Sequence, residues 1–199
     1  MITRLARDRR GATIVEFGMV APVFMLALVA TFDVGHSLYT RAILQGIVQK
    51  VARDSGLETN TTTAAQTALD DKVRAQVIPL ANNATVTITR RYYRTFAQAA
   101  AAQPEPWTDT NSNGRCDAGE PYQDNNRNSL WDNDGGDGGQ GSAKDKTVYT
   151  VALSYPRVFP LWRFIGGSST TRISATTVLA NQPYGDQGSY GTSVVRNCP

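Results

Sequence analysis

RRGATIVEF, residues 9–17, opens an apolar run near the amino terminus. From Phe17 to Phe32 no side chain carries a charge, and four arginines and one aspartate precede the run between positions 1 and 11. A basic flank followed by an apolar run is typical of export and membrane-insertion signals. Counted from Gly11 to Phe32, the run has the length of roughly 20 residues that a bilayer-spanning helix needs.

The charge distribution predicts an exported domain and argues against a nucleic-acid partner. The net charge is +3 and the pI is about 9.0, but residues 1–11 carry the whole excess and residues 12–199 sum to zero. The basic residues therefore indicate a topogenic leader, which places the amino terminus in the cytoplasm and the chain after about Asp33 outside it.

The apolar run is expected to stay in the mature protein as an anchor. A removable signal peptide needs small residues at positions −3 and −1 of its cleavage site. Ala30 is preceded at that spacing by Leu28, and Ala27 by Met25. The helical pattern also continues beyond the run, to about Arg53.

Glu16 is the one acid within the apolar segment. An ionised carboxylate there costs on the order of 2–4 kcal/mol or more. Either Glu16 lies at the headgroup level and stays solvated, or another chain supplies a partner for it.

The pattern Gly11-x-x-x-x-Glu16-Phe17 after a basic leader resembles the processing site of type IV pilin-like proteins. The sequence RRGATIVEFG is most similar to that of TadE-like proteins, the pseudopilins of the Tad (Flp) pilus. This resemblance implies that a prepilin peptidase cuts between Gly11 and Ala12, and that Glu16 pairs with the new amino terminus of a neighbouring subunit. It also implies a bacterial inner-membrane protein whose partners are other pilins and the pilus assembly machinery.

The rest of the chain predicts an α+β fold. Residues 1–11 form the leader, 12–56 a long transmembrane and amphipathic helix kinked at Pro22, and 57–199 the exported domain. A second helix begins at Thr63 and ends before Pro79. Three strands of an antiparallel sheet are expected at 84–96, 146–158 and 172–180, with helix covering one face. The tail from Tyr184 is expected to be a loop. The apolar segment 159–165 is expected to pack against another apolar surface. This order of elements also resembles TadE-like proteins.

An acidic insertion, residues 104–142, departs from a minimal pseudopilin. It contains DTNSNGRCDAGE, residues 109–120, with the spacing of an EF-hand calcium loop and Gly114 at its sixth position. The expected ligands are Asp109, Asn111, Asn113, the carbonyl of Arg115, Asp117 and Glu120.

A second, weaker copy begins fifteen residues later, at Asp124. It has Ser129 at the position of the glycine and Gly135 where the bidentate acid is expected, so that Asp134 or Asp137 could substitute only in a differently shaped loop. The expected ligands are Asp124, Asn126, Asn128, the carbonyl of Leu130 and Asp132. Both copies resemble bacterial calcium-binding repeats of the DxNxNGxxDxGE type.

The alternative for this insertion is a solvated loop without an ion, which its Asp, Asn and Gly content would also allow. Residues 109–137 carry seven acids and two arginines, a net charge of −5 that a divalent ion would offset. We expect one structural calcium ion in the first loop and a second as the weaker prediction.

Two cysteines, Cys116 and Cys198, most simply form one disulfide in an exported chain. Buried free thiols and pairing between chains are the alternatives.

An enzyme is not expected, because the single histidine, His36, lies at the membrane boundary, far from the exported carboxylates. Two functions remain. One is a structural minor pilin or pseudopilin of a Tad-type pilus, acting in assembly, initiation or at the tip. The other is a calcium-dependent adhesin or partner-binding module on an uncleaved anchor.

Overall fold

The computed structural model describes residues 10–55, 62–181, 188–189 and 191–199. The predicted leader lies outside this part of the chain, apart from the backbone of Arg10 and Gly11. The elements follow in the order α2 (Arg10–Ser55), α3 (Thr63–Val77), the 3-10 turn η2 (Ile78–Leu80), β1 (Thr85–Tyr93), α4 (Phe96–Ala100), β2 (Pro121–Asp124), β3 (Asp137–Gly138), β4 (Lys146–Pro156), α5 (Trp162–Ile165), β5 (Thr170–Ala180) and β6 (Val194–Asn197).

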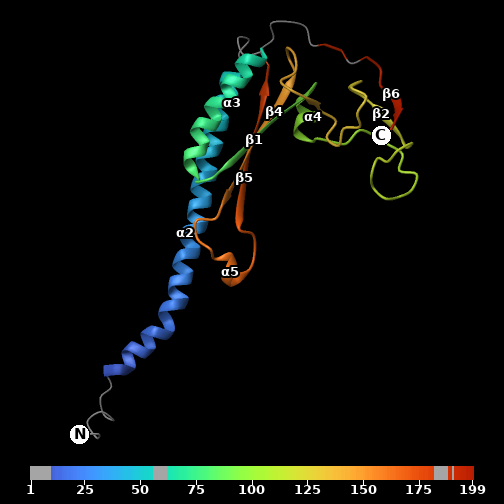
Figure 1. Ribbon diagram of the computed structural model, residues 1–199. Helices are drawn as coiled ribbons and strands as arrows, with labels where there is room; N and C mark the ends of the chain where they lie inside the picture. Colours follow the sequence, from blue (N-terminus) through green and yellow to red (C-terminus); the bar gives the residue numbers. More distant parts are fainter. Residues whose placement is uncertain (1–9, 56–61, 182–187, 190) are drawn as a thin grey trace, which may run out of the picture.

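The long helix α2 extends away from the rest of the molecule as a stalk (Figure 1). It contains Pro22, and its amino-terminal part bends in Figure 1. Proline removes a backbone donor and clashes with the preceding turn, which accounts for a bend in this region. The helix is long and apolar enough to cross a membrane, and its most apolar segment is not buried inside the molecule. It is therefore a candidate membrane anchor.

Strands β1, β4 and β5 form the antiparallel sheet that the sequence predicts, with nearly the expected bounds. In the register, Val151 on β4 lies opposite Ile88 on β1 and Ala175 on β5. The sheet gains a fourth, two-residue strand, β3, so that the order is β3-β1-β4-β5. β3 lacks an apolar alternation, which is why the sequence pattern does not predict it.

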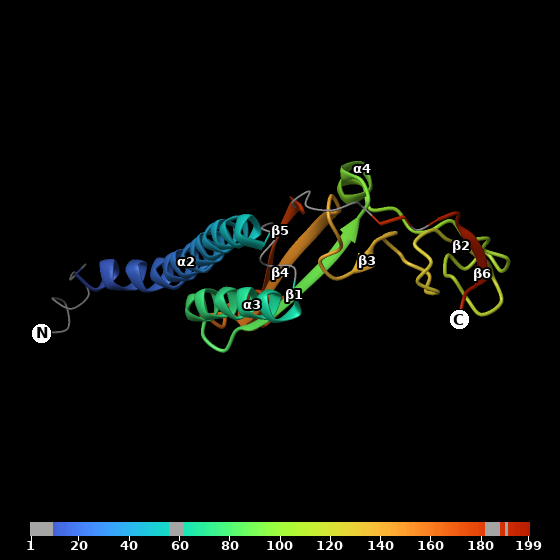
Figure 2. The same ribbon diagram turned by 90° about the horizontal axis from the view of Figure 1, so that it is seen from above.

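The core lies between one face of this sheet and the two helices α2 and α3, which run side by side over it (Figures 1 and 2). The carboxyl-terminal half of α2 turns one stripe of side chains to the sheet, while its other side stays exposed. The buried residues of the core are Leu44, Val48, Val51, Leu69, Val73, Val77, Ala81, Tyr149, Val151, Leu153, Tyr155, Ile173 and Ala175.

A second sheet of two strands, β2 and β6, lies at the end of the molecule far from the amino terminus (Figure 2). The expectation of a loop throughout the tail was therefore wrong for residues 194–197. These four residues form a strand because they pair with β2 and because the disulfide between Cys198 and Cys116 holds their end in place.

A buried polar network fixes α3 against the sheet. Arg90 donates two hydrogen bonds to the carboxylate of Asp70, at 2.6 and 2.7 Å. The hydroxyl of Tyr149 donates to the same carboxylate at 2.9 Å, and the Arg90 guanidinium lies 4.8 Å from the centre of the Tyr149 ring. Burial, followed by the charge of Asp70, raises the pKa of Tyr149 well above its usual value.

Replacing Tyr149 with phenylalanine is expected to lower the free energy of unfolding by about 1–3 kcal/mol, because a hydrogen bond from a buried hydroxyl to a partly buried carboxylate is lost. Urea denaturation of the full chain in detergent measures this loss. Tyr39→Phe is the matched control, since Tyr39 is 63% exposed and its change should stay within about 0.5 kcal/mol. Equal losses for the two variants would contradict a structural role for the network.

Candidate functional site

The predicted processing residues Gly11, Ala12, Glu16 and Phe17 all lie on the exposed first turns of α2. Phe17 is 72% exposed, and a Cβ atom added at Gly11 would meet nothing within 4 Å. The side chains of this segment, that of Glu16 included, are therefore exposed on the helix surface. The preceding residues 1–9 lie outside the described part.

The first predicted calcium loop folds around the carboxylates of Asp109 and Glu120. Asp109 accepts the backbone N–H groups of Asn113 and Gly114, at 3.2 and 2.7 Å. Glu120 is 2% exposed and accepts those of Thr110 and Asp117, at 2.8 and 3.0 Å. The side-chain amides of Asn111 and Asn113 both donate to Oδ2 of Asp117. Hydrogen bonds therefore connect the predicted side-chain ligands of this loop, although among the described residues no three His, Cys, Asp or Glu side chains lie close enough to hold a metal.

The second loop repeats this arrangement. Asp124 accepts the backbone N–H groups of Asn128 and Ser129, at 3.1 and 3.0 Å. The amides of Asn126 and Asn128 both donate to Oδ2 of Asp132, at 2.8 and 2.7 Å. Ser129 adopts a φ of 66°, close to the 74° of Gly114 in the first loop. The serine therefore takes the backbone conformation for which glycine was expected.

The acid missing from the second loop is supplied from upstream, by Glu105. Its carboxylate accepts the backbone N–H groups of Asn125 and Asp132, at 2.7 and 3.2 Å. Its own N–H donates to the carbonyl of Asp132 at 2.9 Å. Glu120 makes the same three hydrogen bonds in the first loop, where its N–H donates to the carbonyl of Asp117 at 3.0 Å. Glu105, which is 1% exposed, thus occupies the place of Glu120.

Sequence reasoning missed Glu105 because it searched for the acid downstream of Asp124. The available signal was a longer repeat: EPWTD, residues 105–109, recurs as EPYQD, residues 120–124. Each repeat begins with the glutamate that completes the loop of the other repeat. Of the two sequence-based alternatives, Asp134 pairs with Arg91. Asp137, in β3, accepts a hydrogen bond from the side-chain amide of Asn128 at 3.1 Å and so lies against the second loop.

The two repeats face each other across a short antiparallel bridge. Trp107 pairs with Tyr122, the residue at the same place in the other repeat. The N–H of Thr108 donates to the carbonyl of Pro121 at 2.9 Å, and the N–H of Gln123 donates to that of Pro106 at 2.8 Å. Because equivalent atoms make both bonds, the repeats are related by a local twofold arrangement.

The electrostatic surroundings of the two loops differ. Hydrogen bonds lower the pKa of Glu120, mainly from the N–H of Asp117, and that of Asp117, mainly from the amide of Asn113. Burial instead raises the pKa of Glu105. Two arginines contact the second loop: Nη2 of Arg91 lies 2.7 Å from Asp132, and Arg196 pairs with Asp124.

The disulfide joins the first loop to the tail. Cys116 bonds to Cys198, as the sequence predicted for its two cysteines. The N–H of Cys198 donates to the carbonyl of Glu120 at 2.8 Å, and the N–H of Gly119 donates to the carbonyl of Cys198 at 3.3 Å. The carboxyl-terminal part of the first loop is thereby held against the tail.

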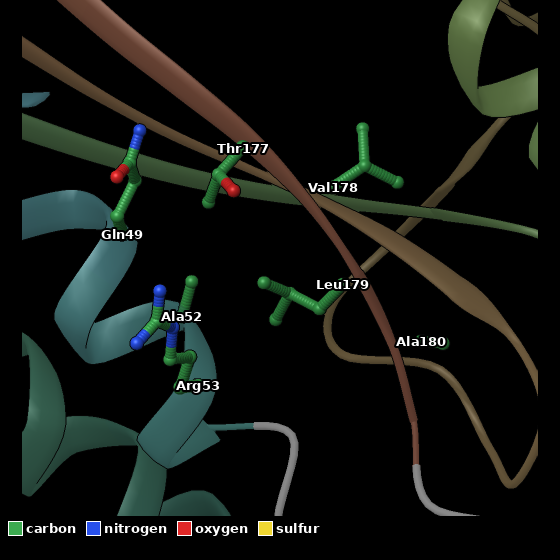
Figure 3. A pocket seen from close by; sticks show the side chains of 7 residues that line it. All are labelled: Gln49, Ala52, Arg53, Thr177, Val178, Leu179 and Ala180. Atoms are coloured by element: carbon green, nitrogen blue, oxygen red, sulfur yellow. The ribbon is translucent and has the colours of Figure 1, made fainter.

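A pocket of about 520 Å³ lies between the end of α2 and β5 (Figure 3). Leu179 points from β5 towards Ala52, whereas Val178 points away (Figure 3). Among the described residues that line it, Arg53 carries the one ionisable side chain. His36 lies apart from this pocket and from both loops, with its ring 5.7 Å from that of Tyr155.

Comparison with known protein families gives a match over the amino-terminal helix. Residues 11–53 match the family model described as TadE-like protein. Neither the curated proteins nor the solved structures gave a match. The matched residues cover almost all of α2 and include Gly11, Ala12, Glu16 and Phe17. The match supports the resemblance to TadE-like proteins over this helix.

Proposed function

We propose that this chain is a structural minor pilin or pseudopilin of a Tad-type pilus. It is held in the inner membrane by α2, cut after Gly11 by a prepilin peptidase, and packed among other pilins through the same helix. The observation that carries the proposal is the Gly11–Glu16 motif on an exposed helix within the TadE-like match. Val34, Leu38 and Tyr39 extend the exposed apolar surface beyond the apolar run that ends at Phe32, which favours packing against further helices.

In this proposal Glu16 offsets the charge of a neighbouring subunit's Ala12 amine. A carboxylate in an apolar helix needs such a partner, and Glu16 is exposed in the single chain. The role is structural and not catalytic.

The mass of the native amino-terminal peptide tests this function. Protein purified from its natural host is expected to begin at Ala12 and to co-isolate with other pilus components. A chain that begins at Met1 and never co-isolates with them would refute the proposal.

We also propose that the paired repeats hold structural calcium ions, one in each loop. The donors fit a hard cation: each loop combines two aspartates, two asparagines and one buried glutamate. Among the described residues, no three His, Cys, Asp or Glu side chains lie close enough to hold a metal. The side-chain amides of the asparagines now donate to Asp117 and Asp132. Calcium binding therefore requires these amides to turn so that their oxygen atoms face the ion. Because Arg91 and Arg196 already offset part of the charge of the second loop, the first loop should bind more tightly.

The second candidate function is a calcium-dependent adhesin or partner-binding module. The position of the repeats favours it, since they lie at the end of the molecule opposite the candidate anchor (Figures 1 and 2). An uncleaved amino terminus together with calcium-dependent surface binding would select this function over the pilin. If cleavage and binding both occur, the repeats are a binding tip on a pilin.

A further inference from the structure

The loop between β4 and β5 lies beside the candidate membrane span. Arg157 at its start forms an ion pair with Asp33, the acid that ends the apolar run of α2. Its apolar side chains then lie along the preceding turns of the helix. A pocket of about 460 Å³ has Met25, Leu26 and Val29 on one wall and Phe159, Leu161 and Phe164 on the other.

The position of this loop along α2 sets its depth. Val29 and Met25 precede Asp33 by four and eight residues, which places them about 6 and 12 Å further along a helix that rises 1.5 Å per residue. If the apolar run spans a bilayer, the loop lies within the outer part of the same hydrocarbon layer.

The loop is unusually apolar on its outer surface. Phe164 is 72% exposed and Val158 59% exposed. Between them, the Arg163 guanidinium lies 5.1 Å from the centre of the Trp162 ring. Exposed aliphatic and phenyl groups next to a tryptophan and an arginine are the composition found at membrane interfaces.

From this placement we propose that residues 157–166 form a second membrane contact, immersed in the outer leaflet of the bilayer that α2 crosses. A lipid acyl chain occupies the apolar pocket. Continuity selects the lipid as occupant, because the pocket wall on α2 belongs to the candidate membrane span, whose most apolar segment is not buried inside the molecule. The inference rests on the proposed anchoring of α2.

Two contacts restrict the domain more than one anchor does. A single helix allows the exported domain to swivel, whereas the loop and the helix together fix its orientation on the membrane surface. The salt bridge between Arg157 and Asp33 holds the two contacts at a constant spacing.

Tryptophan quenching by brominated lipids tests the contact. The full chain is reconstituted in phosphatidylethanolamine–phosphatidylglycerol vesicles whose acyl chains carry bromine close to the headgroups. The fluorescence of the native chain is expected to be quenched, and that of the Trp162→Phe variant is not. The other two tryptophans, Trp107 and Trp131, lie in the distant repeats and should not be reached by the bromine. Phe164→Asp should reduce the quenching about twofold, because a carboxylate is disfavoured in hydrocarbon.

Phe96→Asp is the matched control, since Phe96 is 61% exposed on α4, and it should leave the quenching unchanged. Alkaline extraction reports separately on α2. Release from the vesicles would refute the anchoring itself, whereas a retained chain without Trp162 quenching would overturn only the loop contact. If the fluorescence of Trp162 changes with the protein density in the vesicles and not with the brominated lipid, a second copy of the chain occupies the pocket. That result also overturns the proposal.

Discussion

Replacing either Glu120 or Glu105 with glutamine is expected to remove one of two calcium ions from the protein. The two carboxylates make the same three hydrogen bonds in their respective loops, so each should be the bidentate ligand of one ion. Isothermal titration should find two sites in the native chain, one in each variant and none in the double variant. The 12-residue motif alone predicts no effect for Glu105, which lies outside both motifs.

The same variants should change thermal stability. An ion present at a hundred times its dissociation constant stabilises the fold by about 2.7 kcal/mol. For a chain of this size, losing one ion should lower the melting temperature by roughly 5–10 °C. Asp71→Asn serves as the control, because Asp71 lies exposed on α3, away from the repeats. The calcium proposal would be contradicted if neither millimolar calcium nor a chelator changed the melting temperature of the native chain.

Replacing Gly11 with leucine is expected to abolish amino-terminal processing and, with it, incorporation into the pilus. A peptidase must bring its catalytic groups close to the backbone at the scissile bond, which glycine permits and a bulky side chain blocks. The fold should not change, since a Cβ atom at Gly11 meets nothing within 4 Å.

Gly18→Leu is the matched control for this experiment. Gly18 lies on the same exposed helix and also has nothing within 4 Å of an added Cβ atom. Mass spectrometry of the amino terminus should show an uncut Gly11 variant and a correctly cut Gly18 variant. An unchanged mature amino terminus in the Gly11 variant would count against the pilin function as a whole.

The helices and the central sheet could be predicted because each buries one continuous face. In α2, Leu44, Val48 and Val51 recur at helical spacing, and in β4 alternate residues are buried. Such periodicity is local, so the sequence alone carries it. The bounds of α3 and β1 followed from the same patterns and from Pro79.

The features that escaped prediction depend on contacts between distant segments. β6 is a strand because β2 and the disulfide hold it, and β3 exists because it pairs with Arg91 and Tyr92 on β1. The role of Glu105 likewise depends on a loop that begins nineteen residues later. A search for repeated flanks would have drawn attention to Glu105, but only the three-dimensional arrangement shows that each glutamate serves the other repeat.

The crossed glutamates make the two repeats inseparable. Deleting residues 105–119 would remove one complete motif and also the acid on which the remaining loop folds. A chain with a single fifteen-residue unit would keep a loop that lacks its glutamate. Adding one unit to the present pair would leave one glutamate without its loop. Insertions of this design can therefore be shortened, lengthened or transplanted only in steps of two units.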